Sequence, residues 1–308
     1  MEQNNDVKYL VFDIETVADE DLIKEVKYPH DQITPREARK KFTDELIKKK
    51  DDDFIPYTFQ FPVTLAMAKL REDFTIIDLP VLTFEQGGPG VLVKSFWAGW
   101  ERYKRPTLVT FNGKGFDLPV MEHMAFRYGI PIPGWMKYET YSGGRISLGG
   151  SASANPRNRY NTVSHIDVME ILSNFRPYVG GMNLAAKGIG CPGKIETNGQ
   201  EVQEMFDQKR FAEIHDYCRC DVLDTYFLFL RLMTLSGCMG DKNKDKEKEK
   251  EKENVPVGLD RERILVDLAR KRIEQETANH PIYNTYLEAW SRSRGTRALD
   301  EYCRQVQQ

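Results

Sequence analysis

The strongest constraint on the fold is a short apolar run near the N-terminus, KYLVFDI, which spans Lys8 to Ile14. Its richness in strand-forming residues predicts a strand buried in the centre of a sheet. Asp13 and Glu15 lie at the end of this run, and residues i and i+2 of a strand point to the same face. Two carboxylates on an apolar sheet are costly unless a cation pairs with them, so they predict a divalent-metal site. The alternative is a pair of ordinary surface acids at a strand end.

A third acid follows a second predicted strand. The segment PTLVTFN, from Pro106 to Asn112, predicts another buried strand, and a helix is expected from Leu118 to Tyr128. Asp117 lies between the two, after Gly113 and Gly115. These glycines would let the backbone approach a ligand closely. The alternative role of Asp117 is an ordinary helix N-cap.

The fourth acid lies on the longest predicted helix, from Lys209 to Leu235. Tyr217 and Asp221 are four residues apart in the sequence HDYCRCDVLDTY. This spacing places both side chains on one face of a helix. The alternative is a structural hydrogen bond between them.

The rest of the chain supplies further strands and helices. Their order suggests an α/β layer structure with a mixed sheet. The charged stretch from Asp19 to Asp53 is helix-prone, with Pro35 placed to open a helix. We expect a hairpin of FPVTLAMAKL (61–70) with TIIDLPVL (75–82), a helix over 91–103, a strand running into a helix in VSHIDVMEIL (163–172), and helices over 261–276 and 283–290.

Composition limits the possible functions. Hydrophobic residues make up 40% of the 308 residues and charged residues 30%, which favours a buried core over disorder. The net charge of −3 means that binding to nucleic acid must depend on local basic patches or on bound metal. The five cysteines form no C-x-x-C pair, so neither a zinc ribbon nor a disulfide framework is supported.

Several segments predict domain organisation and location. The N-terminal sequence MEQNNDVKYL has no apolar signal core, and no 18-residue apolar run occurs, so we expect a cytoplasmic protein that does not enter the membrane. The run Lys242 to Glu253 alternates basic and acidic residues, which predicts an exposed connector, and Gly143 to Thr162 predicts a long loop. We therefore expect a main domain over 1–237, a linker over 238–254 and a helical extension over 255–308.

Three ordered motifs resemble those of the DEDD exonucleases, also called DnaQ-like or RNase H-like. Asp13 and Glu15 match the D-x-E strand, Asn112 to Asp117 match N-x-x-x-F-D, and Tyr217 with Asp221 matches Y-x-x-x-D of the tyrosine subclass. His215 is out of register for the histidine subclass, which needs H-x-x-x-x-D. The N-x-x-x-F-D form, HIDVMEIL and GIGCPGK are similar to the proofreading domain of family B DNA polymerases and its stand-alone bacterial relatives. The resemblance covers about residues 9–237.

The resemblance implies an RNase H-like, five-stranded mixed sheet flanked by helices, with a C-terminal helical extension. It also implies a 3'-5' exonuclease that releases nucleoside 5'-monophosphates and uses two Mg²⁺ or Mn²⁺ ions. Tyr217 would orient the attacking water, since a tyrosine with an unperturbed pKa near 10 is a poor base at neutral pH. The implied metal ligands are Asp13, Glu15, Asp117 and Asp221, and the implied substrate contacts are Asn112, Phe116, Lys194 and the backbone at Thr16 and Val17.

Basic side chains near these motifs are candidate contacts to phosphate, although solvated surface charge is the alternative for each one. They are Lys114, Lys187, Lys194, Arg145, Arg157 and Arg159. His165 and Asp167 are expected to be structural and to close a strand end. The implied partner is a nucleic-acid 3' end, with single-stranded DNA favoured, and any polymerase or repair protein would act in trans.

Three alternatives remain open. The enzyme could act on RNA, or the fold could be an inactive nucleic-acid-binding scaffold, although all five motif positions carry the required residue types. A more distant alternative is an aspartyl-phosphate phosphatase. VFDIET is similar to its D-x-D-x-T motif, and GDKNKD (240–245) is similar to its later acidic motif.

Overall fold

The computed structural model describes residues 6–136, 139–140, 146–147, 155–177, 180–193, 199–239 and 257–292. The predicted connector at 242–253 lies outside these residues, and of the predicted loop at 143–162 only 146–147 and 155–162 are described. Strands β6 (Glu139–Thr140) and β7 (Ile146–Ser147) form a separate two-stranded sheet.

The main sheet is mixed, as the sequence predicts. Its central strand is β1 (Tyr9–Ala18), which pairs antiparallel with β2 (Gln60–Leu70) on one side and parallel with β5 (Thr107–Thr110) on the other. Strand β8 (His165–Asp167) runs parallel to β5 at the edge. The order is β3-β2-β1-β5-β8, and β4 also pairs with β2.

The sheet has six strands rather than the five expected. The predicted strand TIIDLPVL is divided into β3 (Ile76–Asp78) and β4 (Val81–Thr83), which pair with different parts of β2. Pro80 lies between them. It has no backbone N–H to donate to the sheet, although its carbonyl still accepts a hydrogen bond of 3.0 Å from the N–H of Met67. A proline inside the predicted strand therefore accounts for the extra strand.

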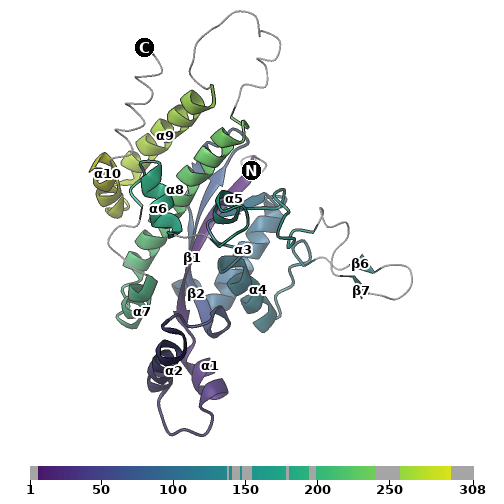
Figure 1. The fold of residues 1–308 in the computed structure, drawn as a ribbon, viewed down its shortest axis with the longest axis vertical. Helices are drawn as coiled ribbons and strands as arrows, with labels where there is room; N and C mark the ends of the chain where they lie inside the picture. Colours follow the sequence, from purple (N-terminus) through teal and green to yellow (C-terminus); the bar gives the residue numbers. More distant parts are fainter. Residues whose placement is uncertain are drawn as a thin grey trace, which may run out of the picture.

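Helices cover both faces of the sheet (Figure 1). Alternate residues of β1 face opposite sides: Leu10 and Phe12 pack with α3 and α4, whereas Val11 packs with α8. The helices are α1 (Glu20–Lys27), α2 (Pro35–Lys50), α3 (Gly88–Arg102), α4 (Asp117–Arg127), α5 (Val168–Leu172), α6 (Gly181–Gly188), α7 (Gly199–Asp207), α8 (Phe211–Leu235), α9 (Val257–Glu276) and α10 (Ile282–Arg292). Pro35 opens α2 as predicted, after a Thr34 capping box.

The C-terminal helices α9 and α10 pack against α8 (Figure 1). Ile273, Tyr286 and Trp290 are buried in the same hydrophobic cluster as residues of α8 and β1. The boundaries expected at 237 and 255 remain predictions. None of the helices in the described part of the chain is long and apolar enough to cross a membrane.

Candidate active site

Strand β1 places Asp13 and Glu15 on the face of the sheet that α8 covers. Asp13 is opposite Ala66 and Glu15 is opposite Thr64 in the register with β2. Glu15 is buried and Asp13 is half-buried. Both therefore project under a helix, on one face of the sheet, as the alternation of the strand predicts.

Helix α8 carries the predicted Tyr217 and Asp221, and it also places the Cys218 thiol beside Asp13 and Glu15. The Cys218 thiol lies 3.4 Å from the backbone oxygen of Asp13 and 3.9 Å from its Oδ2. One carboxylate oxygen each of Asp13 and Glu15 lies within 4.8 Å of the Cys218 sulfur and of the other oxygen. None of the sequence motifs predicts a role for Cys218, and its position next to Tyr217 is the only signal that could have pointed to it.

Asp117 enters the same region from the end of β5. Strand β5 stops at Thr110 while β1 continues to Ala18, so the loop after β5 can turn back toward β1. Asp117 begins α4 and is only 3% exposed. Its Oδ1 is buried and has no hydrogen-bond partner among the described residues. Burying a carboxylate oxygen without a hydrogen-bond partner destabilises the folded protein unless a ligand binds to that oxygen.

Burial above all, together with the charges of Asp167 and Asp221, raises the pKa of Asp117 to about 7, although hydrogen bonds from the backbone N–H groups of Asp117 and Ile14 oppose part of the rise. Asp117 therefore lies at the backbone of β1, near enough to Asp221 of α8 for the two charges to interact.

The pKa of Tyr217 is raised by burial first, then by the charges of Asp221, Glu15 and Asp13, and by a side-chain hydrogen bond with Asp221. Burial and the charges of Asp13 and Glu15 also raise the pKa of the Cys218 thiol. Since the same carboxylates act on each of these groups, the side chains surround one common volume. Negative charge so concentrated favours a bound cation.

The residues present fit a hard divalent cation. The donors are carboxylate oxygens, which Mg²⁺ and Mn²⁺ prefer, and the Oδ1 of Asp117 lacks a protein partner among the described residues. Cys218 is buried and holds its proton, since burial raises its pKa. Its sulfur is therefore a neighbour of the acids and not a natural ligand for such an ion.

Asp167 holds the loop that carries the second motif. Its side chain caps α5 and accepts hydrogen bonds from the backbone N–H of Asn112 (3.0 Å) and of Lys114 (2.9 Å). Nearby, His165 Nε2 lies 2.8 Å from Thr110 Oγ1, and burial lowers the pKa of His165 to about 3, so it is neutral. These contacts agree with the structural roles expected for both residues.

The two glycines of this loop serve the turn itself. A Cβ at Gly113 would lie 2.2 Å from Oγ1 of Thr110, and one at Gly115 would lie 2.5 Å from Oδ1 of Asn112. Both glycines therefore allow a close approach to neighbouring side chains, and the expected approach to a ligand stays a prediction. Asn112 itself has a φ of 67°, which asparagine tolerates better than most residues.

The other expected substrate contacts are placed as follows. The Thr16 hydroxyl donates a hydrogen bond to Gln60, and Val17 is buried beside Tyr217. Asn112 is exposed, and Phe116 is half-buried with its ring 5.6 Å from that of Phe54. Lys194 and Arg145 lie outside the described residues, and Lys187 is exposed on α6.

The His215 ring makes its hydrogen bonds outside the cluster of Asp13, Glu15, Asp117 and Asp221. Its Nδ1 lies 2.7 Å from Thr64 Oγ1, and its Nε2 lies 3.1 Å from Glu85 Oε2. These contacts direct its ring toward β2 and the turn before α3.

Comparison with known proteins supports a nuclease. Residues 52–269 match the family described as a predicted 3'-5' exonuclease related to the exonuclease domain of PolB. The match spans more than two thirds of the chain, so this protein belongs to that family. It includes Asp117, Tyr217 and Asp221, whereas Asp13 and Glu15 precede it.

A similar solved structure is the family B DNA polymerase from the hyperthermophilic archaeon Pyrobaculum calidifontis, at 14% identity and a TM-score of 0.43. The alignment covers 88% of this chain and 29% of the polymerase chain. No curated protein sequence matches the chain.

Proposed function

We propose that this protein is a 3'-5' exonuclease of the tyrosine DEDD subclass, which removes nucleoside 5'-monophosphates from the 3' end of single-stranded DNA. The observation that carries the proposal is the convergence of β1, α4 and α8 on one acidic volume. One carboxylate oxygen each of Asp13 and Glu15 lies within 4.8 Å of the Cys218 sulfur, which neighbours Tyr217 on α8. Tyr217 hydrogen-bonds Asp221, and the charge of Asp221 acts on the buried Asp117. Membership of the exonuclease family supports the same reaction.

Two Mg²⁺ or Mn²⁺ ions would be held by Asp13, Glu15, Asp117 and Asp221. When bound, such ions neutralise charge on the scissile phosphate and lower the pKa of the attacking water. The four carboxylates concentrate negative charge in a largely buried site, and this charge would make binding of the ions favourable.

Tyr217 would position water rather than remove its proton. Burial and the nearby carboxylates raise its pKa, so the phenol keeps its proton at neutral pH. A protonated hydroxyl that hydrogen-bonds Asp221 is held in one orientation. Asn112 and Phe116, at the more open edge of the site, would hold and stack the terminal nucleotides.

The direct test uses oligonucleotides of DNA and RNA labelled at the 5' end and incubated with Mg²⁺, Mn²⁺ or EDTA. We expect a ladder that shortens from the 3' end, slower cleavage of a 3'-phosphorylated strand, and no cleavage in EDTA. Faster shortening of RNA would assign RNA as the substrate, and binding without cleavage would assign a scaffold. Cleavage from the 5' end, or activity undiminished by EDTA, would contradict the proposal.

A further inference from the structure

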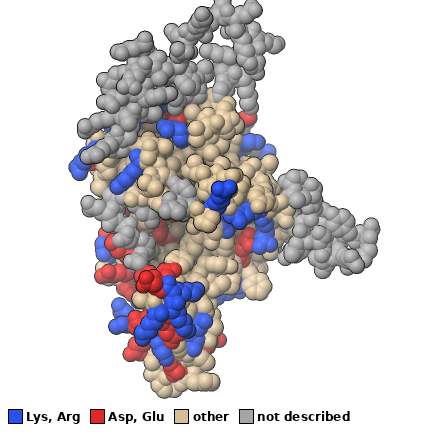
Figure 2. Space-filling model, in the orientation of Figure 1, with Lys and Arg blue, Asp and Glu red and all other residues tan. Residues whose placement is uncertain are grey.

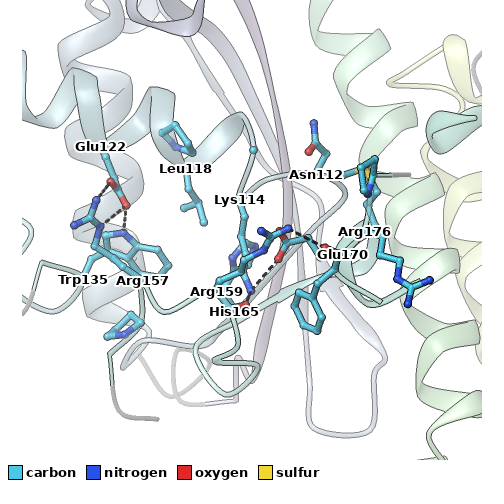
Figure 3. A pocket seen from close by; sticks show the side chains of 16 residues that line it. Asn112, Lys114, Leu118, Glu122, Trp135, Arg157, Arg159, His165, Glu170 and Arg176 are labelled. Carbon is cyan, nitrogen blue, oxygen red and sulfur yellow. Dashed lines mark hydrogen bonds and ion pairs between the residues drawn. The ribbon is translucent and has the colours of Figure 1, made fainter. Parts of the chain in front are cut away.

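A cavity of about 660 Å³ is lined by Gly115 and Leu118, which flank Asp117 in the sequence (Figure 3). Asn112, Lys114 and Gly115 of the loop before α4 line it on one side. The segment after α5, which includes Phe175 and Arg176, lines it on another. This volume is within the range of small-ligand sites and is sufficient for one nucleotide.

The cavity has an apolar and aromatic lining. Trp135 is buried in its wall, and the Phe175 ring is half-buried. Tyr160 extends this aromatic surface outward, with its ring 4.9 Å from that of Phe175 and with 69% of the residue exposed. The guanidinium of Arg159 lies 5.9 Å from the Phe175 ring centre. Aromatic rings beside arginines provide the stacking surface and the charge that single-stranded nucleic acid uses.

The charge of the lining is positive, in contrast to the whole chain. Four cationic side chains line the cavity against the two carboxylates of Glu122 and Glu170. Both carboxylates are already paired: Glu122 with Arg157 at 2.8 Å, and Glu170 with Arg159 at 2.8 Å. Lys and Arg side chains also gather over α5 in the space-filling view (Figure 2). A local excess of positive charge on a chain of net charge −3 favours an anionic ligand.

One end of the cavity lies against the loop that leads to Asp117. Glu122 and Arg157 lie at one end, and Asn112 and Arg176 lie at the other (Figure 3). Asn112 begins the loop that leads to Asp117, and Asp167 fixes that loop through two backbone hydrogen bonds. A ligand at the Arg176 end therefore lies against the loop that leads into the proposed active site.

We propose that this cavity is a nucleotide subsite, in which a base stacks on Phe175 and a phosphate contacts Arg176 and Arg159. The ligand is a nucleotide of a single strand bound at the active site, or a free nucleoside monophosphate. The first source rests on the proposed exonuclease function, and the second does not.

Binding without cleavage tests the subsite independently of catalysis. A 5'-fluorescein oligothymidylate of about ten nucleotides is titrated in EDTA and followed by anisotropy over a range of salt concentrations. For Arg176→Gln we expect weaker binding and a salt slope smaller by about 0.7, which corresponds to one lost phosphate contact on a single strand. For Phe175→Leu we expect binding weaker by roughly tenfold, because stacking is lost.

The control is Arg292→Gln on α10, where the arginine side chain is 77% exposed. It removes one positive charge at a residue outside the cavity lining, so the affinity for the oligonucleotide and the salt slope should both be unchanged. Arg176 is exposed, so its variant should fold even if Phe175→Leu is destabilised.

Two further measurements identify the source of the nucleotide. If a strand fills the cavity, kcat/KM in Mn²⁺ should rise as the substrate lengthens from two to about ten nucleotides. In Arg176→Gln this rise should be much smaller, whereas Arg292→Gln should show the same rise as the parent. If the ligand is a free nucleotide, equilibrium dialysis should show dAMP binding that depends on Arg176.

The outcomes separate the two proposals. If oligonucleotide and dAMP binding are both indifferent to Arg176→Gln and Phe175→Leu, the subsite is wrong even when 3' shortening is observed. If binding depends on these residues but no 3' shortening occurs, the exonuclease function is wrong and the subsite stands.

Discussion

The Tyr217 hydroxyl lies where it can act only as a proton-bearing group. Its pKa is raised by burial and by Asp221, Glu15 and Asp13, so it does not ionise near neutral pH. We predict that Tyr217→Phe lowers kcat by roughly 10- to 1,000-fold, leaves KM nearly unchanged and does not alter the shape of the pH profile. Steady-state kinetics on a labelled oligonucleotide measure all three.

The control for this prediction is Tyr128→Phe, which removes the hydroxyl of a residue that is 46% exposed at the end of α4. It should behave as the parent. A Tyr217→Phe protein with full activity would remove the tyrosine from the mechanism.

We predict that Asp13→Asn changes the melting temperature in opposite directions with and without metal. Without metal, Asp13→Asn removes one of several mutually repelling charges and keeps nearly the same shape, so it should melt no lower than the parent in EDTA. In millimolar Mn²⁺ the order should reverse, since an ion at a hundredfold excess over its Kd stabilises the folded parent by about 2.7 kcal/mol. Thermal melting with and without Mn²⁺ measures both effects. Equal Mn²⁺ shifts in the two proteins would show that the metal binds elsewhere.

At the scale of elements, α10 is joined to α8 through a buried hydrogen bond. The Tyr286 hydroxyl donates to Oδ1 of Asp224 at 2.7 Å, and both residues are fully buried. Asp224 lies close to one turn from Asp221. Burial above all, together with the charge of Asp221, raises the pKa of Asp224 to about 7, although the hydrogen bond from Tyr286 opposes part of the rise.

This pKa predicts a pH-dependent stability. A carboxyl whose folded pKa is raised stabilises the fold fully below its unfolded pKa, and that stability is lost as pH rises through the folded value. Between about pH 5 and about pH 8 the parent should lose on the order of 2 kcal/mol through Asp224. Asp224→Asn should show a shallower loss in urea unfolding in EDTA, whatever its constant offset. Glu288→Gln, at an exposed position of α10, should keep the parental slope, and an unchanged slope in Asp224→Asn would contradict the prediction.

The elements with a strong local signal could be predicted from sequence. The apolar runs at β1 and β5 predicted the centre of the sheet, and the spacing of Tyr217 and Asp221 predicted the helix that faces it. The proline predicted the start of α2. The contacts of Asp167 with the Asn112 loop and of Tyr286 with Asp224 join residues far apart in the chain. Local periodicity carries no information about such pairings. Lys114, Arg157 and Arg159 of the cavity lining were candidate phosphate contacts from sequence, whereas its aromatic lining was not predicted, for the same reason.

At the scale of the whole molecule, the C-terminal helices contribute to the main core. The ring of Trp290 lies 4.7 Å from that of Phe227 on α8, and both residues are buried. We predict that a chain shortened to residues 1–237 melts at a lower temperature than the parent and loses activity, because it exposes the face of α8 that α9 and α10 cover.

A chain that lacks only residues 242–253 is the control, and it should melt close to the parent. Calorimetry of the full chain should show one cooperative transition. A shortened chain with the parental melting temperature would show that the extension is an independent unit.

The central claim is that hard cations held by these carboxylates act on the scissile phosphate at a 3' end. The most direct measurement compares the two diastereomers of an oligonucleotide with a single phosphorothioate at its 3'-terminal linkage. Sulfur is a poor ligand for Mg²⁺ and a better one for Mn²⁺. We predict that one diastereomer is cleaved at least about tenfold more slowly than the other in Mg²⁺ and that Mn²⁺ restores much of the rate. Equal cleavage of both diastereomers in Mg²⁺, or cleavage that persists in EDTA, would contradict it.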